Sequence, residues 1–238
     1  MNRRKFIYNS SIASLSVMGL QSCNILDRNV KISILHTNDV HSQIEAFPFN
    51  HNIYPDRGGF AKRANIFKGL RKINPNTLIF DAGDIFQGTP YFNFFQGELE
   101  LNLMKKMGYN AATIGNHEFD AGLDILKRNI INNDFQFISS NYDFTNTSLE
   151  GLVSRYKVYK KQNIRIGVFG LGIELKGLVN PKLYKETKYY DPIEISNEMT
   201  QKLKTEENCD LIICISHLGH TYQDDKISDL RLASLTSD

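Results

Sequence analysis

The chain has 238 residues, of which 41% are hydrophobic, 23% charged and 11% aromatic. This composition is typical of an ordinary α/β domain and excludes collagen, a coiled coil, a disulfide-rich scaffold and a disordered chain. The 28 lysines and arginines nearly balance the 26 aspartates and glutamates, and a net charge of +2 gives no argument for a nucleic-acid partner. No nucleic acid is therefore expected among the partners.

Residues 1–22 have the layout of an export signal. A basic start at residues 3–5 is followed by a serine-rich, mildly apolar stretch that is too short to cross a bilayer. The arginine pair resembles a twin-arginine signal, and residues 20–23 resemble a lipobox. We therefore expect export to the periplasm or cell envelope, with Cys23 as a lipidated first residue that anchors the protein to the membrane. A cytosolic tail with a chance arginine pair is the alternative.

Removal of the signal changes both the charge and the cysteine inventory. Residues 1–22 contain three cations and no acids, so the net charge falls from +2 to about −1. Besides Cys23, the chain keeps Cys209 and Cys214, which are expected on one strand. At about 3.3 Å per residue they lie roughly 16 Å apart, too far for a disulfide. No paired C-x-x-C accompanies them, so we do not expect them to bind metal.

Strands and helices alternate after a polar tether at residues 23–30. The expected elements are a strand at 31–35, a helix at 58–73, a buried strand at 77–80, a helix at 92–107, a short strand at 111–114, a helix at 123–131 and a strand at 135–139. A hairpin of 155–159 and 164–169 follows, then a helix at 194–204, a buried strand at 211–215 and a helix at 225–235. This alternation predicts a layered α/β domain, and the hairpin predicts a mixed sheet.

Side chains with metal-ligand chemistry follow four of the expected strands. They are Asp39 and His41 after the first strand, Asp81 and Asp84 after the second, Asn116, His117, Glu118 and Asp120 after the third, and His217 and His220 after the strand at 211–215. Ligands bind at the carboxyl ends of strands in open α/β sheets, so we expect these side chains to meet. Mixed carboxylate, imidazole and amide-oxygen ligands suit Zn, Mn, Fe or Co rather than Ca or Mg alone.

Two divalent ions explain this set better than one. A carboxylate such as Asp84 can bridge two ions about 3.5–4 Å apart, the spacing that serves hydrolysis at phosphorus. Asn116 offers a carbonyl oxygen and His217 an imidazole. His117, beside Asn116, is expected to point elsewhere and act as an acid, with Asp120 holding its tautomer and charge.

These motifs resemble those of the calcineurin-like metallophosphoesterases. The matching residues are Asp39-x-His41, GDIFQG at 83–88, GNHEFD at 115–120 and His217-Leu-Gly-His220, and GDIFQGTP with GNHEFD resembles the bacterial 5′-nucleotidase branch. The resemblance extends from about residue 30 to residue 233. It implies a four-layer α/β/β/α sandwich with mixed sheets and a dinuclear metal centre between strand ends.

The resemblance also implies a role for each residue of the site. One ion is expected on Asp39, His41 and Asp84, and the other on Asp84, Asn116 and His217. His117 and Asp120 match the catalytic dyad of the family. The implied reaction is hydrolysis of a phosphate ester, a nucleotide in the 5′-nucleotidase branch, by a metal-bridging hydroxide.

The family has a further motif, Gly-Gly-His-x-His, which is expected after the helix at 225–235. Residues 31–238 do not contain it, so we expect an incomplete domain that lacks its C-terminal strands. A separate chain that carries the remaining part is then an expected partner. Two alternatives to the 5′-nucleotidase stay open: a weak or inactive metal-binding lipoprotein, and another metallophosphoesterase such as a nuclease or a sulfur-ester hydrolase.

The remaining candidate residues are expected to have mainly structural roles. His36 is expected to pack in the core, and His220 is expected beside the ligands or at the surface. Asp81 could brace the second motif, and Glu118 could orient its loop. The aromatic stretch 91–95 could stack bases, but its helical spacing favours a buried face.

Overall fold

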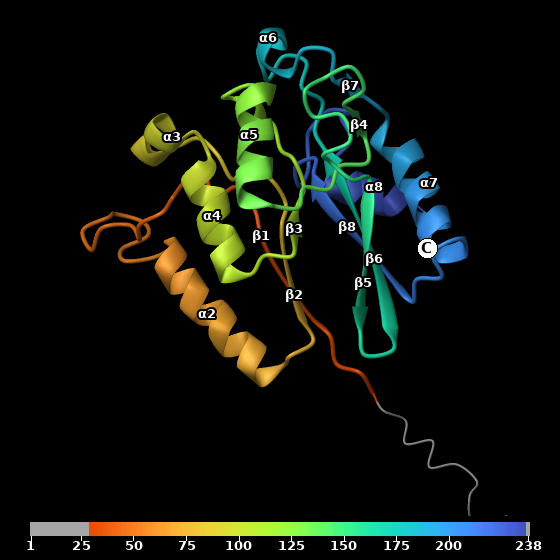
Figure 1. Ribbon diagram of the computed structural model, residues 1–238, viewed down its shortest axis with the longest axis horizontal. Helices are drawn as coiled ribbons and strands as arrows, with labels where there is room; N and C mark the ends of the chain where they lie inside the picture. Colours follow the sequence, from red (N-terminus) through yellow and green to blue (C-terminus); the bar gives the residue numbers. More distant parts are fainter. Residues whose placement is uncertain (1–28, 237–238) are drawn as a thin grey trace, which may run out of the picture. The chain divides into compact units, whose positions relative to one another are not determined.

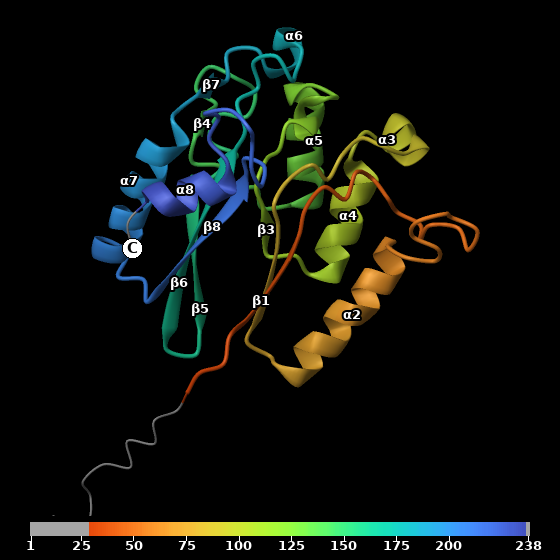
Figure 2. The ribbon, with the colours of Figure 1, turned by 180° about the vertical axis from the view of Figure 1, so that it is seen from behind.

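Two three-stranded β-sheets carry the fold (Figures 1 and 2). The computed structural model describes residues 29–236, and the chain divides into two units, 1–31 and 32–238. The fold described here is that of the second unit. The expected export signal and Cys23 lie outside the described residues.

The first sheet is parallel and the second is mixed. The first has the order β1 (Ser33–Thr37), β2 (Thr77–Asp81), β3 (Ala111–Ala112), and the second has the order β5 (Tyr156–Lys161), β6 (Ile164–Gly172), β8 (Leu211–His217). Strand β6 pairs antiparallel with β5 and parallel with β8. A small antiparallel ribbon joins β4 (Tyr142–Asp143) and β7 (Lys188–Tyr189). The predicted α/β class is confirmed, and so is the hairpin.

Helices cover the outer face of each sheet. The helices of the described residues are α2 (Phe60–Ile73), α3 (Pro90–Phe95), α4 (Glu98–Met107), η1 (His117–Phe119), α5 (Leu123–Asn133), α6 (Pro181–Tyr184), α7 (Pro192–Thr205) and α8 (Asp229–Leu235). Figure 1 shows α2, α4 and α5 on one side of the strands, and α7 and α8 on the other. No helix in the described part of the chain is long and apolar enough to cross a membrane.

Three apolar clusters hold these layers together. Side chains of β2 and β3 that face outward pack against α2, α4 and α5. Between the sheets, Leu78 and Phe80 of β2 meet Ile166 and Val168 of β6. The outer face of β6 packs on α7 and α8. Successive side chains of β2 and β6 point to opposite faces, and both faces are covered. This explains why the sequences of these two strands read as continuous apolar runs.

The predicted helix at 92–107 is wrong as a single element. It consists of α3 and α4, separated by Gln96 and Gly97, which both adopt left-handed backbone angles with φ of 52° and 93°. The predicted stop at Gly108 is confirmed, since Gly108 has φ of 78° and its N–H bonds Lys105 O.

Several predicted strands and faces also differ from the structure. Residues 135–139 form only isolated bridges, Ala112 to Phe137 and Ile138 to Ser154, and not a strand. The strand at 211–215 is not fully buried: β8 is an edge strand, and Leu211 is 39% exposed. The last helix begins at Asp229, where the hydroxyl of Ser228 caps it, and not at residue 225. Sheet order, rather than local apolarity, decides which strand is buried.

A methyl group added at Gly69 or at Gly97 is expected to change the free energy of unfolding in opposite directions. Gly69 lies inside α2 with nothing within 4 Å of a Cβ, whereas a Cβ on Gly97 would overlap the Phe86 ring and sit on a left-handed residue. We expect Gly69→Ala to raise the free energy of unfolding by about 0.5–1 kcal/mol. Gly97→Ala should lower it by more than about 1 kcal/mol. Urea unfolding of both variants checks this, and equal shifts would contradict it.

Candidate metal centre

Asp84 lies at the centre of the candidate site. It follows β2 and is almost fully buried. Three imidazole Nε2 atoms face its Oδ2, at 3.3 Å for His217, 3.9 Å for His41 and 4.0 Å for His117. The structure therefore gathers side chains that are up to 176 residues apart in sequence around one carboxylate oxygen.

Two backbone hydrogen bonds join the loop after β1 to the loop after β2. Asp39 N–H donates to Gly83 O at 3.0 Å, and His41 N–H donates to Asp84 O at 3.1 Å. Asp39, His41 and Asp84 have φ between 42° and 56°, which side-chain-bearing residues seldom adopt. Such conformations persist where the surroundings impose them and concentrate at functional sites. The loops after β1 and β2 are thus held in the form that turns their side chains toward each other.

Glycines allow the second and third motif loops to touch. A Cβ on Gly83 would lie 2.7 Å from Gly115 N, and a Cβ on Gly115 would lie 2.7 Å from Asp84 N and 3.0 Å from His217 Cδ2. Any larger residue would push these loops apart. The glycines of the two motifs therefore serve close packing around Asp84.

The side chains form two candidate ligand groups with Asp84 in common. One group is His41, Asp84 and His117, and the other is Asp39, Asp84 and His217, with ligand atoms within 4.8 Å of one another. Carboxylate and imidazole donors of this kind fit transition-metal cations, and a shared carboxylate fits two of them. The residues present therefore fit a dimetal site.

The grouping differs in detail from the ligand sets expected for each ion. Asp39, His41, Asp84 and His217 come together as predicted, but Asp39 groups with His217 and His117 groups with His41. Asn116 is half-buried at the start of η1, directly after Gly115. Its role as a ligand stays a prediction.

His117 and Asp120 form a hydrogen-bonded pair. His117 Nδ1 lies 2.7 Å from Asp120 Oδ2, and both residues belong to the turn around η1. Burial opposes the charged imidazolium and is the largest single effect. The hydrogen bond to Asp120 and the nearby carboxylates of Asp84, Asp120 and Glu118 together outweigh it, so the pKa of His117 is raised. The backbone N–H of His117 also donates to Asp84 Oδ1 at 2.9 Å. His117 is itself a member of one ligand group, and its Nε2 is free of Asp120.

Asp84 and His217 stabilise each other's charged forms. Burial disfavours the Asp84 carboxylate and is the largest single effect, yet the hydrogen bond and charge of His217, with the backbone N–H and imidazole of His117, together lower the pKa of Asp84 below its ordinary value. Burial likewise disfavours the His217 imidazolium, and the Asp84 carboxylate still raises the pKa of His217 to about 9. The His217 Nδ1 lies 2.7 Å from Ala82 O, which fixes the ring. The pocket therefore attracts positive charge toward Asp84 Oδ2.

Glu118 holds two of these loops in place. Its side chain is fully buried and accepts four hydrogen bonds from backbone N–H groups: Asp84 at 2.9 Å, Ile85 at 2.7 Å, Gly115 at 2.6 Å and a longer one from Phe86 at 3.3 Å. Burial raises the pKa of Glu118, and the backbone donors act in the opposite direction. The sequence suggested loop orientation by Glu118, and the structure shows that it joins the GDIFQG and GNHEFD loops.

Asp81 braces the same region, as predicted. Its Oδ1 accepts the Gly83 N–H at 3.0 Å, and its Oδ2 accepts the Thr37 hydroxyl at 2.5 Å. Burial raises the pKa of Asp81 to about 7. Asp81 thus links the ends of β1 and β2, next to the loops that carry the candidate ligands.

Other sequence-based expectations need correction. His36 is exposed on β1 and does not pack in the core, because β1 is an edge strand. The expectation for His220 is confirmed instead: it lies at the surface and belongs to neither ligand group in the described part of the chain. The aromatic stretch does not form one buried face: Phe92 is buried, but Phe94 is 81% exposed and Phe95 46%.

Comparisons with known proteins agree with this geometry. The calcineurin-like phosphoesterase family model matches residues 32–237. The chain belongs to this family. It is 33% identical over 204 residues to a 5′-nucleotidase of Vibrio vulnificus, and the match covers 84% of this chain and 36% of that protein.

Solved structures give the same picture. A 5′-nucleotidase precursor from Thermus thermophilus is 31% identical with a TM-score of 0.73, and the match covers 79% of this chain and 37% of the other. The NAD nucleotidase of Haemophilus influenzae is 32% identical with a TM-score of 0.67, and the match covers 80% and 34%. The chain thus spans about a third of the length of each of these three relatives.

Proposed function

We propose that this metallophosphoesterase is a 5′-nucleotidase-like phosphomonoesterase that uses two divalent metal ions. The observation that carries the proposal is the convergence of His41, His117 and His217 on Asp84 Oδ2, with Asp120 paired to His117. The three core clusters support the four-layer α/β/β/α arrangement expected for such enzymes. The named relatives support a nucleotide as the substrate class.

The residues divide into metal ligands and a proton donor. We propose Asp39, His41, Asp84, Asn116 and His217 as ligands, with Asp84 shared. Bound divalent cations neutralise phosphoryl charge and lower the pKa of water.

His117 is then left for proton transfer. Its Nδ1 is held by Asp120 at 2.7 Å, so the proton on Nε2 is the one that can move to a departing alcohol oxygen. The raised pKa of His117 favours the imidazolium that this role requires. Asp120 supports the role by fixing the orientation and the charge of the ring.

Replacement of His117 tests this division. His117→Ala is expected to reduce hydrolysis of p-nitrophenyl phosphate by about 10²–10⁴-fold, because a general acid contributes that much. Metal content, measured by plasma mass spectrometry on the same samples, should stay near two ions per chain. His220→Ala is the matched control, since His220 is exposed and outside both ligand groups.

The outcomes separate the possible roles. Loss of metal together with activity in His117→Ala would make His117 a ligand, as its grouping with His41 and Asp84 also permits. Full activity in the variant would refute the proton-donor role. Comparison of AMP with a phosphodiester then tests the substrate class, and preference for the diester would contradict a 5′-nucleotidase.

A further inference from the structure

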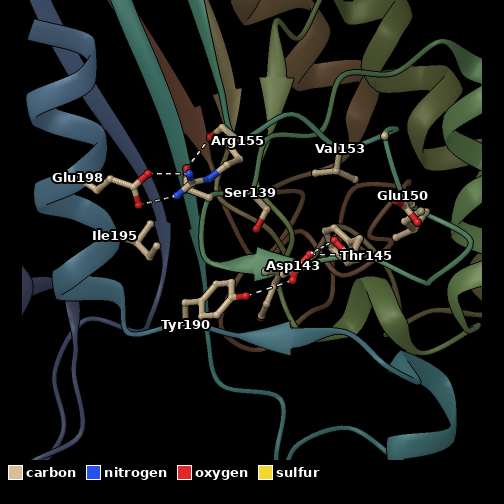
Figure 3. Close-up of a pocket in the computed structure, with 14 residues that line it drawn as sticks. Ser139, Asp143, Thr145, Glu150, Val153, Arg155, Tyr190, Ile195 and Glu198 are labelled. Atoms are coloured by element: carbon tan, nitrogen blue, oxygen red, sulfur yellow. Dashed lines mark hydrogen bonds and ion pairs between the residues drawn. The ribbon is translucent and has the colours of Figure 1, made fainter. Parts of the chain in front are cut away.

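A second cavity lies between the small β4–β7 ribbon, the loop that follows β4, and α7 (Figure 3). Its volume is about 460 Å³, within the range of small-molecule sites. None of the residues that line it belongs to the candidate metal centre. It therefore needs an explanation of its own.

Ser139 gives the cavity a buried polar group without a partner. The residue is 2% exposed, and its Oγ makes no hydrogen bond in the described part of the chain. Figure 3 shows Ser139 amid the labelled cavity side chains, with Asp143 and Tyr190 on the same side as its hydroxyl. A buried hydroxyl that lacks a partner destabilises the fold, and nearly all such groups in proteins are satisfied. A polar ligand would supply the partner.

Two preformed pairs hold polar side chains at the wall of the cavity. The Arg155 guanidinium donates to both oxygens of Glu198, at 2.7 and 2.9 Å. The Tyr190 hydroxyl donates to Asp143 Oδ2 at 3.1 Å, and Thr145 donates twice to Asp143 Oδ1. Since a carboxylate can accept about four hydrogen bonds, both acids keep acceptor capacity for a ligand. Their side chains are already ordered, which reduces the entropy cost of binding.

The charge of the cavity selects against anions. Three acids line the cavity, Asp143, Glu150 and Glu198, with one lining cation, Arg155, whose donors already engage Glu198. Lys188 does not line the cavity, but its Nζ lies 3.6 Å from Asp143 Oδ2 and offsets part of this negative charge. The hydrogen bonds from Thr145 lower the pKa of Asp143 to about 2, so Asp143 is charged at neutral pH. A phosphate or carboxylate would meet repulsion here. The wall instead offers acceptors for hydroxyl donors.

Apolar surface completes the site. Ile195 and Val153 line the cavity between the polar groups, and the Tyr190 ring stands at its edge (Figure 3). Aliphatic and aromatic carbon beside carboxylates suits a ring that has an apolar face and hydroxyls at its rim. A charged, acyclic or purely apolar molecule would contact either the polar groups or the apolar carbon of this lining, but not both.

We propose that this cavity binds a neutral polyhydroxylated ring, either the ribose of a nucleoside or a free monosaccharide. Its hydroxyls donate to Asp143 and Glu198, and Ser139 bonds a further ligand oxygen. The choice of a nucleoside as the first source rests on the proposed function, because removal of phosphate from a nucleotide releases a nucleoside. The monosaccharide source does not depend on that function.

Calorimetric titration of the full chain tests the proposal. The probes are adenosine, methyl β-D-ribofuranoside and AMP, all in the presence of EDTA so that the metal centre takes no part. Adenosine or the riboside should bind at least tenfold more tightly than AMP. Glu198→Gln should weaken that binding at least tenfold, whereas Glu194→Gln, an exposed position on the same helix that does not line the cavity, should leave it unchanged.

Ser139→Ala separates a binding role from a structural one. Because its hydroxyl has no partner in the structure, the variant should keep the thermal stability of the parent while binding adenosine or the riboside more weakly. Binding of the riboside without adenosine assigns the monosaccharide source. No binding of any probe, tighter binding of AMP, or equal affinity in Glu198→Gln would overturn the proposal. The His117 experiment is independent of these results, so either conclusion can fail alone.

Discussion

Asp84→Asn is expected to abolish turnover of p-nitrophenyl phosphate and to remove both metal ions together. Asp84 Oδ2 is the atom that three imidazoles face, and Asp84 is the residue common to both ligand groups. Asparagine keeps the shape of the side chain but removes its charge. The loss should exceed about a hundredfold, which is the upper range for residues that merely support a metal ligand.

Metal analysis decides between a bridging and a single-ion role for Asp84. The purified variant should contain neither ion, and circular dichroism should show that it is folded. Asp134→Asn is the control, since Asp134 is exposed and pairs only with Lys105 in the described residues. Retention of two ions in Asp84→Asn would contradict a shared ligand, and loss of one ion alone would assign Asp84 to that ion.

The residues of this centre could be predicted because strand direction brings them together. Asp39 and Asp84 follow neighbouring parallel strands, so their loops meet at one sheet edge. Short motifs with glycines signal such loops without knowledge of the rest of the fold. His217 comes from the other sheet, and the same signal predicted it, since it directly follows an expected strand; the resemblance to a family then assigned it to one ion.

The features that the sequence did not predict depend on tertiary context. The apolar pattern through residues 92–107 continues across the break, and the left-handed Gln96 carries no mark in its residue type. The apolar run of β8 suggested burial, but β8 lies at an edge, and sheet order is not a local property. Glu118 was visible beside His117, yet its four donors come from two loops that are more than 25 residues apart. Sequence patterns predict helices and strands better than they predict which polar groups become hydrogen-bonded to one another.

Glu118→Gln is expected to destabilise the fold by about 3 kcal/mol or more. Four backbone N–H groups converge on this carboxylate, and an amide replaces one acceptor oxygen by a donor that faces those N–H groups. Each buried backbone N–H group that is left without an acceptor costs about 1–3 kcal/mol, and the amide leaves at least two of them unpaired. The loops that hold Asp84 and Asn116 should also loosen, so metal affinity should fall although no ligand is replaced.

Glu100 provides the matched control, because it is also a fully buried glutamate. In contrast to Glu118, it has one hydrogen-bond donor, the Ser42 hydroxyl at Oε1, and its Oε2 has no partner within the described part of the chain. Glutamine can keep the bond to Ser42, so Glu100→Gln should change the free energy of unfolding by less than about 1 kcal/mol at pH 5. Urea unfolding at equal metal concentration compares the two variants. Equal losses would show that burial alone, and not the four donors, makes Glu118 important.

The pH dependence of Glu100 adds an independent check. Burial raises the pKa of Glu100 above its ordinary value of 4.5. The folded state therefore keeps a proton that the unfolded chain releases as the pH rises past 4.5, and the parent protein loses stability through that interval. Glutamine has no proton to release, so the stability of Glu100→Gln relative to the parent should increase from pH 4.5 to pH 7.5. A constant difference would mean that Glu100 ionises in the folded protein as readily as it does in the unfolded chain.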